Sequence, residues 1–225
     1  LRCNKEMKRY IPLMCIMALL SSCASKITRA EMYPKMYEEK PATILVMPPI
    51  NNSNNADAKE YFYSSLAKPL NEKGYYVVSP NMAMDILKQE SAYDSELFVN
   101  GSLTPFRNFF NVDAVLFTTI NKWEKKSGLS YILVDIAYTL KSAKTGEVLF
   151  ERDGELKVSF SSGGSGLLSM ALDMLNTAMT DHVVAARRCN YYVLADMPEG
   201  KYGLDYMKDG DVKVGDKKLK GSVGK

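Results

Sequence analysis

The chain has 225 residues, of which 46% are hydrophobic and 24% charged, as is ordinary for a globular protein. Its length suits one well-buried domain with extensions. The formal net charge of +3 comes from the first 22 residues, where Arg2, Lys5, Lys8 and Arg9 stand against Glu6. The rest of the chain is balanced in charge, which argues against a nucleic-acid-binding protein because such proteins cluster Lys and Arg.

The beginning of the chain has the organisation of a bacterial lipoprotein signal peptide. A basic stretch ending at Arg9 precedes an apolar stretch from Tyr10 to Leu20. As a helix this stretch spans roughly 17 Å, too little for the ~30 Å hydrocarbon core of a membrane. Leu20-Ser21-Ser22-Cys23 then matches the lipoprotein box. We expect residues 1–22 to be removed and Cys23 to be acylated, for example by palmitate. The alternative is plain secretory cleavage near Ala24.

The residues after the cysteine bear on the membrane to which the protein is sorted. Ala24 and Ser25 follow Cys23, and no Asp stands beside it. By resemblance to lipoprotein sorting in enteric bacteria, this implies the outer membrane, with the domain facing the periplasm. Several acyl chains at about 0.8 kcal/mol per buried methylene give practically permanent anchoring. Residues 23–40 are polar without a clear period and are predicted to be a lipid-anchored tether.

The cysteines provide neither a disulfide nor a metal site in the mature chain. Cys3 and Cys15 lie in the leader and Cys23 is expected to carry lipid, which leaves Cys189 alone. No spacing resembles a metal-binding motif. Cys189 is predicted to be a buried or half-buried bystander.

An α/β domain is predicted over residues 41–195. Short apolar runs that end at Pro or Gly indicate strands, and apolar residues that recur every three or four positions indicate helices. The predicted elements in chain order are a strand at 43–47 buried on both faces, a helix at 57–72, a buried strand at 75–78, helices at 80–90 and 103–110, strands at 113–123, 129–141 and 147–159, a helix at 167–188 and an edge strand at 191–194.

Single residues refine these elements. The helix at 57–72 is predicted to have Asp57 as its cap, to bend or end its regular part early at Pro69, and to stop at Gly74. In the helix at 80–90, Met82 and Ile86 are expected to face inward, with Leu87 as a further candidate. The strand at 129–141 alternates in hydrophobicity, so one face should meet a core and the other water.

The fold class that results is α/β (α+β). We expect a mixed sheet of about five strands, with helices packed against it and an antiparallel meander joined by turns at 125–128 and 143–146. Residues 161–166 are predicted to be a flexible joint. Residues 196–225 are rich in Gly, Lys and Asp and are predicted to be a loose tail.

No pattern specifies a reaction. The glycines at 161–166 lack the Gly-Lys-Ser/Thr ending of a phosphate-binding loop. His182 has no metal ligands at helical spacing and is predicted to be structural. Asp209, Asp211 and Asp216 lack the twelve-residue calcium pattern, and no Gly-x-Ser-x-Gly elbow occurs. We therefore predict no catalytic residue, no metal and no cofactor.

Two surfaces are candidates for binding a partner. The first is the loop after the opening strand, because α/β sheets receive ligands at this edge, prolines reduce the ordering cost of binding and amides offer donors and acceptors. Its alternative is a rigid structural turn. The second is an aromatic surface that suits a protein interface, against ordinary core and rim packing. The residues are Pro48, Pro49, Asn51, Asn52 and Ser53 for the loop, and Tyr75 and Tyr76 for the aromatic surface.

Four segments together form a specific combination of motifs. They are 40–53 with Pro48-Pro49-Ile50-Asn51-Asn52-Ser53, 69–77 with Gly74-Tyr75-Tyr76-Val77, 112–117 and 144–150. This combination resembles an uncharacterised family of bacterial lipoproteins that includes a conserved neisserial surface lipoprotein antigen. The resemblance covers about residues 20–195 and leaves out the lysine-rich tail.

The resemblance implies a fold similar to the N-terminal domain of the Tol-Pal translocation protein and to the curli secretion channel lipoprotein. It also implies a role beside curli-channel-type lipoproteins in envelope transport or assembly, and it provides no catalytic residues. We therefore predict a non-enzymatic outer-membrane lipoprotein that binds envelope proteins, with a curli-channel-like lipoprotein or a second copy of itself as candidate partners.

Two other functions stay open. The first is a periplasmic module that binds a small molecule or glycan in an aromatic-lined cleft, which a closed apolar pocket near Tyr75 or Tyr76 would favour. The second is an enzyme, which is the weakest reading because acid, base and nucleophile groups are not recognisably assembled.

Overall fold

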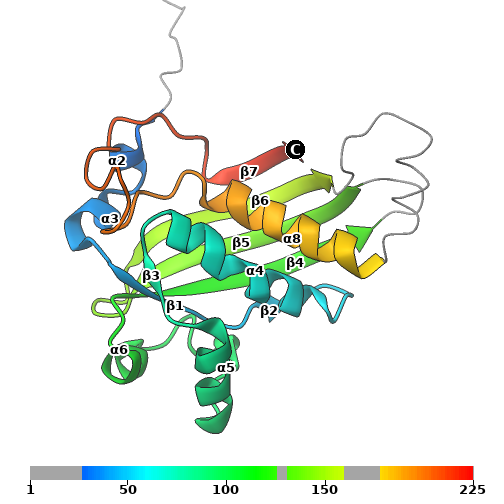
Figure 1. Cartoon of the computed structure of the whole chain (residues 1–225), viewed down its shortest axis with the longest axis horizontal. Helices are drawn as coiled ribbons and strands as arrows, with labels where there is room; N and C mark the ends of the chain where they lie inside the picture. Colours follow the sequence, from blue (N-terminus) through cyan, green and yellow to red (C-terminus); the bar gives the residue numbers. More distant parts are fainter. Residues whose placement is uncertain (1–26, 126–130, 160–177, 225) are drawn as a thin grey trace, which may run out of the picture.

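The computed structural model describes residues 27–125, 131–159 and 178–224 (Figure 1). Its strands are β1 (Thr43–Val46), β2 (Ile50–Asn51), β3 (Tyr76–Val77), β4 (Ala114–Lys125), β5 (Tyr131–Ser142), β6 (Val148–Ser159) and β7 (Lys218–Val223). Its helices are α2 (Arg29–Met32), α3 (Pro34–Glu39), α4 (Ala58–Glu72), α5 (Pro80–Gln89), the 3₁₀ turn η1 (Ser95–Leu97), α6 (Thr104–Phe110) and α8 (Ala178–Leu194).

The described strands form one seven-stranded mixed sheet in the order β3-β1-β4-β5-β6-β7, with β2 paired to β4. β1 runs parallel to β3 and β4, β4 to β6 form an antiparallel meander, and β7 runs parallel to β6. The predicted α/β fold with a meander is confirmed. The sheet is larger than the predicted five strands because β2 and β7 lie in segments expected to be irregular.

Helices cover both faces of the sheet, but not equally. α4 and α8 lie along one face, whereas α5 and α6 lie beyond the other face near β1 (Figure 1). The domain has a main core under α4 and α8 and a second, smaller core under α5 and α6. Ile44 and Val46 point into the main core, and Leu45 and Met47 point into the second core. β1 is therefore buried on both faces, as predicted.

The alternation of β5 is also confirmed. Its even-numbered residues from Ile132 to Leu140 are fully buried in the core under α4 and α8. Most of the residues between them are half-exposed on the opposite face. The meander therefore presents one apolar and one solvated face, as is common for antiparallel strands.

Asp57 occupies the N-cap position of α4, as predicted, but its side chain does not cap the helix. Instead, the Oδ1 of Asn55 accepts a hydrogen bond from the backbone N–H of Ala58 at 3.1 Å. The early end at Pro69 is wrong, since the helix continues to Glu72. Leu70, just past the proline, is fully buried, and its packing outweighs the hydrogen bond that proline cannot donate.

Gly74 ends this helix, as predicted. The N–H of Gly74 donates to the carbonyl of Asn71 at 2.9 Å, and that of Tyr75 donates to Leu70 at 3.2 Å. These two bonds define a Schellman motif, which requires the left-handed backbone that Gly74 adopts at φ 81°. The motif turns the chain directly into β3.

Two predictions about the next segment are wrong in part. β3 is an edge strand of the sheet and not a buried one, so Tyr76 is 60% exposed. In α5, Leu87 is buried as predicted, but Met82 points to solvent and Ala83 takes the inward position. The second core is small, so one narrow stripe of α5 is enough to cover it.

The predicted edge strand at 191–194 is wrong, because α8 continues to Leu194. Its buried residues recur at helical spacing: they are Ala185, Ala186, Cys189, Asn190, Val193 and Leu194. This period outweighs the strand preference of the sequence Tyr-Tyr-Val-Leu. The predicted joint at 161–166, the helix residues 167–177 and most of the turn at 125–128 lie outside the described residues.

The segments predicted as a tether and a loose tail are ordered from residue 28 to 40 and from 197 to 224. α2 and α3 place Tyr33 and Met36 in the main core, and β7 adds Leu219 and Val223 to it. Each segment supplies only a few such residues, too few to establish a period. They fill gaps in a core that other elements form. The sequence alone therefore predicts a tether and a loose tail where the structure has ordered segments.

Replacing Gly74 by Ala should destabilise the protein more than replacing Gly146 by Ala. Both glycines have positive φ, so each alanine would bear about 1–2 kcal/mol of left-handed strain. A Cβ at Gly146 meets open space, whereas a Cβ at Gly74 would lie 2.0 Å from the backbone nitrogen of Gly203. We expect urea denaturation to show a loss at Gly74 at least about twice that at Gly146. Equal losses would contradict this packing.

Candidate functional site

Most residues of the predicted binding loop are buried or hydrogen-bonded within the domain. Pro48 and Pro49 are buried, and the Oγ of Ser95 donates to the carbonyl of Pro48 at 2.5 Å. Ile50–Asn51 return to the sheet as β2, and the N–H of Asn52 donates to the carbonyl of Ile120 at 2.8 Å. The prolines are therefore packing residues, and the chain has little freedom here.

The amide of Asn51 is used within the loop. Its Nδ2 donates to the carbonyl of Asn55 at 2.8 Å, and its Oδ1 accepts from the N–H of Ser53 at 3.1 Å. This arrangement agrees with the alternative interpretation, a rigid structural turn that starts α4. Asn52 is exposed and is the member of the predicted loop that is most available to a partner.

Tyr75 and Tyr76 do not share a surface. Tyr75 is buried, its hydroxyl donates to the carbonyl of Pro198 at 2.7 Å, and burial raises its pKa well above the ordinary value. A Cβ at Gly200 would lie 2.8 Å from the ring of Tyr75, so the C-terminal segment fills the space beside it. Only Tyr76 of this pair is exposed.

The other residues singled out from the sequence have structural surroundings. Cys189 is fully buried, which confirms that prediction, and burial raises the pKa of its thiol to about 12. His182 accepts a hydrogen bond at its Nδ1 from the Nε1 of Trp123 at 3.0 Å and stacks on Tyr61. Cys23 and the lipoprotein box lie outside the described residues and stay a prediction.

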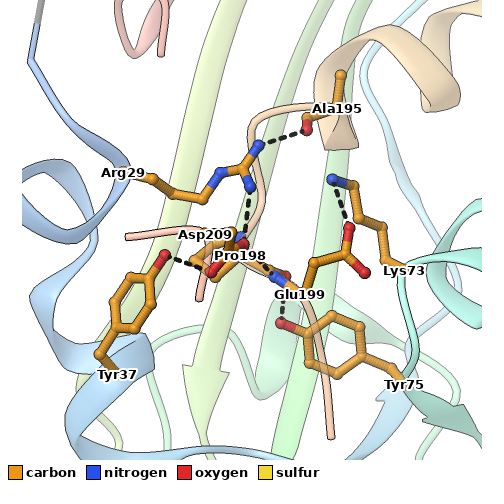
Figure 2. A network of polar contacts seen from close by, with 8 residues as sticks. All are labelled: Arg29, Tyr37, Lys73, Tyr75, Ala195, Pro198, Glu199 and Asp209. Carbon is orange, nitrogen blue, oxygen red and sulfur yellow. Dashed lines mark hydrogen bonds and ion pairs between the residues drawn. The ribbon is translucent and has the colours of Figure 1, made fainter. Parts of the chain in front are cut away.

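A buried ion pair joins the beginning and the end of the described chain (Figure 2). The Nη1 of Arg29 in α2 lies 2.7 Å from the Oδ2 of Asp209, and both side chains are almost fully buried. The hydroxyl of Tyr37 donates to the Oδ1 of Asp209 at 2.9 Å, and the N–H of Glu199 donates to its Oδ2 at 2.8 Å. The carboxylate therefore receives donors from three separate segments.

The same network extends to the end of α4 and to β3. The Nζ of Lys73 lies 3.3 Å from the Oε1 of Glu199, and the N–H of Gly200 donates to the carbonyl of Lys73 at 2.7 Å. Together with Tyr75 and its bond to Pro198, these contacts fasten the C-terminal segment onto the domain (Figure 2).

Sequence reasoning missed this network. Arg29 lies in the segment predicted to be a tether and Asp209 in the segment predicted to be a loose tail. From the sequence, Asp209 belongs only to an incomplete calcium motif. No local pattern connects two charges 180 positions apart. Only the tertiary structure brings them together.

An apolar groove of about 310 Å³ lies between α5 and α6. Its lining comprises Ile86, Leu87, Glu90, Ala92, Phe98, Pro105, Phe106, Phe109 and Phe110. Phe106 is buried and packs edge-on against Phe98 with ring centres 4.9 Å apart, whereas Phe109 is 62% exposed. Leu97 and Met82, on η1 and α5, are also exposed.

The profile of a protein family described as "Putative lipoprotein GNA1162-like" matches residues 32–201 of this chain. The chain belongs to that family. This confirms the resemblance to a lipoprotein family with a neisserial member. Arg29 and Asp209 lie outside the matched residues.

Among similar proteins, the lipoprotein NMB1124/NMB1162 of Neisseria meningitidis serogroup B is 27% identical over 172 residues, which cover 72% of this chain and 78% of that protein. The crystal structure of lipoprotein GNA1162 from Neisseria meningitidis shares 26% identity at a TM-score of 0.49 and covers 60% of this chain and 95% of its own. PelC from Paraburkholderia phytofirmans, crystallised as a dodecamer, shares 15% identity at a TM-score of 0.45, with 71% and 90% covered.

The described residues lack both a membrane-spanning helix and a metal-binding cluster. None of their helices is long and apolar enough to cross a membrane. They also contain no group of three or more His, Cys, Asp or Glu residues placed to hold a metal ion.

Replacing Asp209 by Asn should lower stability in a pH-dependent way. Burial alone would raise the pKa of Asp209, but hydrogen bonds from Glu199, Arg29 and Tyr37 outweigh it and lower the pKa. The carboxylate therefore stabilises the fold above the ordinary carboxyl pKa of about 4, and this stability is lost as the pH falls through the folded value. At pH 7 the variant leaves Arg29 buried without its counter-charge, which costs about 3 kcal/mol.

The measurement is urea denaturation of both proteins between pH 7 and pH 2. We expect the difference in unfolding free energy between wild type and Asp209→Asn to shrink below about pH 4. Asp205→Asn, an exposed change in the same segment, serves as the control and should leave stability nearly unchanged. A difference that stays constant down to pH 2 would show that the charge of Asp209 is not what stabilises the fold.

Proposed function

We propose that this chain is a non-enzymatic lipoprotein of the bacterial outer membrane, facing the periplasm, that binds another envelope protein of a transport or assembly system. Membership in a lipoprotein family supports the class of protein. The sequence Leu20-Ser21-Ser22-Cys23 supports the acylation of Cys23. The apolar groove between α5 and α6 is the main observation in support of the binding role.

The groove has the composition of a protein-binding surface. A cluster of exposed apolar side chains on a folded domain marks an interaction site more often than an accident of packing. Phe109 is exposed, whereas Phe98 and Phe110 are partly buried against the core that contains Phe106 and Leu87. Aromatic residues are enriched at the centres of interfaces.

The surroundings of the groove fit the same interpretation. Lys88 and Arg107 are exposed on the two helices that border it, and they provide the polar rim that protein interfaces usually have. The α5–α6 side of the sheet is also free of α4 and α8, which cover the other face (Figure 1). A partner can therefore approach without displacing a helix of the main core.

The absence of an enzymatic role is part of this proposal. Glu90 is the one charged residue among those that line the groove. A catalytic site needs a nucleophile or an acid–base pair held in place around a substrate. A single carboxylate at an apolar surface supports binding better than catalysis.

The second candidate function is the binding of a small apolar molecule. The groove volume of about 310 Å³ lies at the lower end of the range of small-molecule sites. Its lining of phenylalanines suits an apolar ligand and not a glycan, whose hydroxyl groups need hydrogen-bond partners. The location differs from the predicted cleft at Tyr75 and Tyr76, because Tyr75 is buried under the C-terminal segment.

Cys23 is expected to carry the lipid anchor. Cells that express the wild type and take up a clickable fatty-acid analogue should label the protein, and Cys23→Ala should abolish the label because the lipoprotein box then has no thiol to receive diacylglycerol. Cys189→Ala is the matched control and should label like the wild type, since this thiol is buried. A Cys23→Ala protein that still labels would refute the anchor.

Phe109→Glu is expected to weaken partner binding without unfolding the domain. The side chain is exposed, so the change leaves the core intact, but it places a charge in the apolar groove. In-cell crosslinking followed by purification should recover at least about ten-fold less of the partner, as is typical of a central interface residue.

Two further variants complete this experiment. Val183→Glu puts the same charge on another exposed apolar position, on α8 at the opposite face of the sheet, and should recover as much partner as the wild type. Asn52→Ala tests the predicted loop in the same assay. Full recovery with Phe109→Glu would dismiss the groove, and a loss with Asn52→Ala would return the role to the loop.

A further inference from the structure

Exposed apolar side chains gather on the C-terminal segment and on the residue that enters the domain from the N-terminal side. The side chain of Leu204 is the extreme case, since the residue is 96% exposed. The exposed apolar set, as we call it, consists of Ile27, Tyr202, Leu204, Met207 and Val212. Solvent-exposed apolar residues are normal when scattered singly, but a set of five on two adjoining segments needs an explanation.

The backbone that carries these residues is hydrogen-bonded to the rest of the domain. The carbonyl of Ile27 accepts from the N–H of Val214 at 3.0 Å, and the N–H of Arg29 donates to Val212 at 2.8 Å. The N–H of Tyr202 donates to the carbonyl of Gly74 at 2.9 Å. The segment is therefore fixed by its backbone and by the ion pair of Asp209, while its large apolar side chains point away from the domain.

The short distance along the chain between Cys23 and Ile27 indicates that a lipid surface covers the exposed apolar set. Ile27 comes four residues after Cys23, and four residues reach at most about 14 Å when fully extended. The interfacial layer on each side of a bilayer is itself roughly 5–8 Å thick. An acyl chain on Cys23 therefore brings this end of the domain to the lipid headgroups.

The polar residues of the segment fit a lipid surface as well. Lys201, Lys208 and Lys213 are exposed beside the apolar residues, against the two exposed carboxylates of Asp205 and Asp211, which leaves a small positive excess. Lysine side chains attract anionic lipid headgroups, and a tyrosine such as Tyr202 is suited to the interfacial layer, where its ring is buried and its hydroxyl stays wet. Apolar residues flanked by lysines are typical of segments that lie in the membrane interface.

We propose that the exposed apolar set docks on the phospholipid surface next to the anchor, with Leu204 inserted at the boundary of headgroups and acyl chains. This inference rests on the proposed function, because it needs acylated Cys23. In Figure 1, α2 and the C-terminal loop lie at the top of the view, whereas α5 and α6 lie at the bottom, beyond the sheet. Docking thus fixes the orientation of the domain and directs the α5–α6 groove away from the membrane.

The test uses the full acylated protein, reconstituted into vesicles of phosphatidylethanolamine and phosphatidylglycerol. Tryptophan is introduced by Leu204→Trp and, as a matched control at the other end of the domain, by Met82→Trp; both positions are exposed, so folding is preserved. The native Trp123 is buried and gives a constant background. The readout is the emission maximum and the quenching by lipids that carry a nitroxide near the headgroup.

We expect Leu204→Trp to show a blue-shifted emission and the loss of most of its added intensity with nitroxide lipids, and Met82→Trp to show neither. Equal quenching of the two variants would overturn the docking. A photocrosslinker at position 204 that captures a protein in cells, without lipid quenching in vesicles, would overturn it in favour of a protein partner. Fatty-acid labelling of the same samples separates the causes: unlabelled protein refutes the anchor, whereas labelled protein without quenching refutes the docking alone.

Discussion

The ion pair between Arg29 and Asp209 is the interaction on which the arrangement of both chain ends depends. A buried charge pair has to compensate for lost hydration, and it does so only when the remaining hydrogen-bonding capacity is used. Here Tyr37 and the backbone of Glu199 supply that compensation at Asp209, whereas the buried Nε of Arg29 has no hydrogen-bond partner. The pair therefore specifies one position for α2 and for the C-terminal loop, where few apolar contacts are available to do so.

This constraint connects the fold with the proposed function. An anchor that ends in a flexible tether would let the domain turn freely beneath the membrane. Because α2 is clamped to the C-terminal loop, residues 28–40 are ordered, and an acylated Cys23 would hold one defined end of the domain at the lipid. The apolar groove at α5 and α6 is then presented at a reproducible distance and direction, which suits a component of a larger envelope assembly.

The sequence predicted those elements whose own residues carry a strong local signal. β1 was found because an apolar run stops at two prolines, β5 because its residues alternate, and Gly74 because a helix end needs a left-handed residue. The groove was only partly predictable from the sequence. Its two helices were predicted, but Met82 was placed inward, because periodicity alone does not reveal how little of the second core α5 has to cover.

The sequence by itself determined the class of protein: a lipoprotein box at Cys23, a family of lipoproteins and an α/β domain with a meander. The tertiary structure decided what the two ends of the chain do. Residues 28–40 and 197–224 are fixed by isolated apolar insertions and by an ion pair between positions 180 apart. Such contacts leave no period, composition or motif in either segment, because their partners lie in distant parts of the chain.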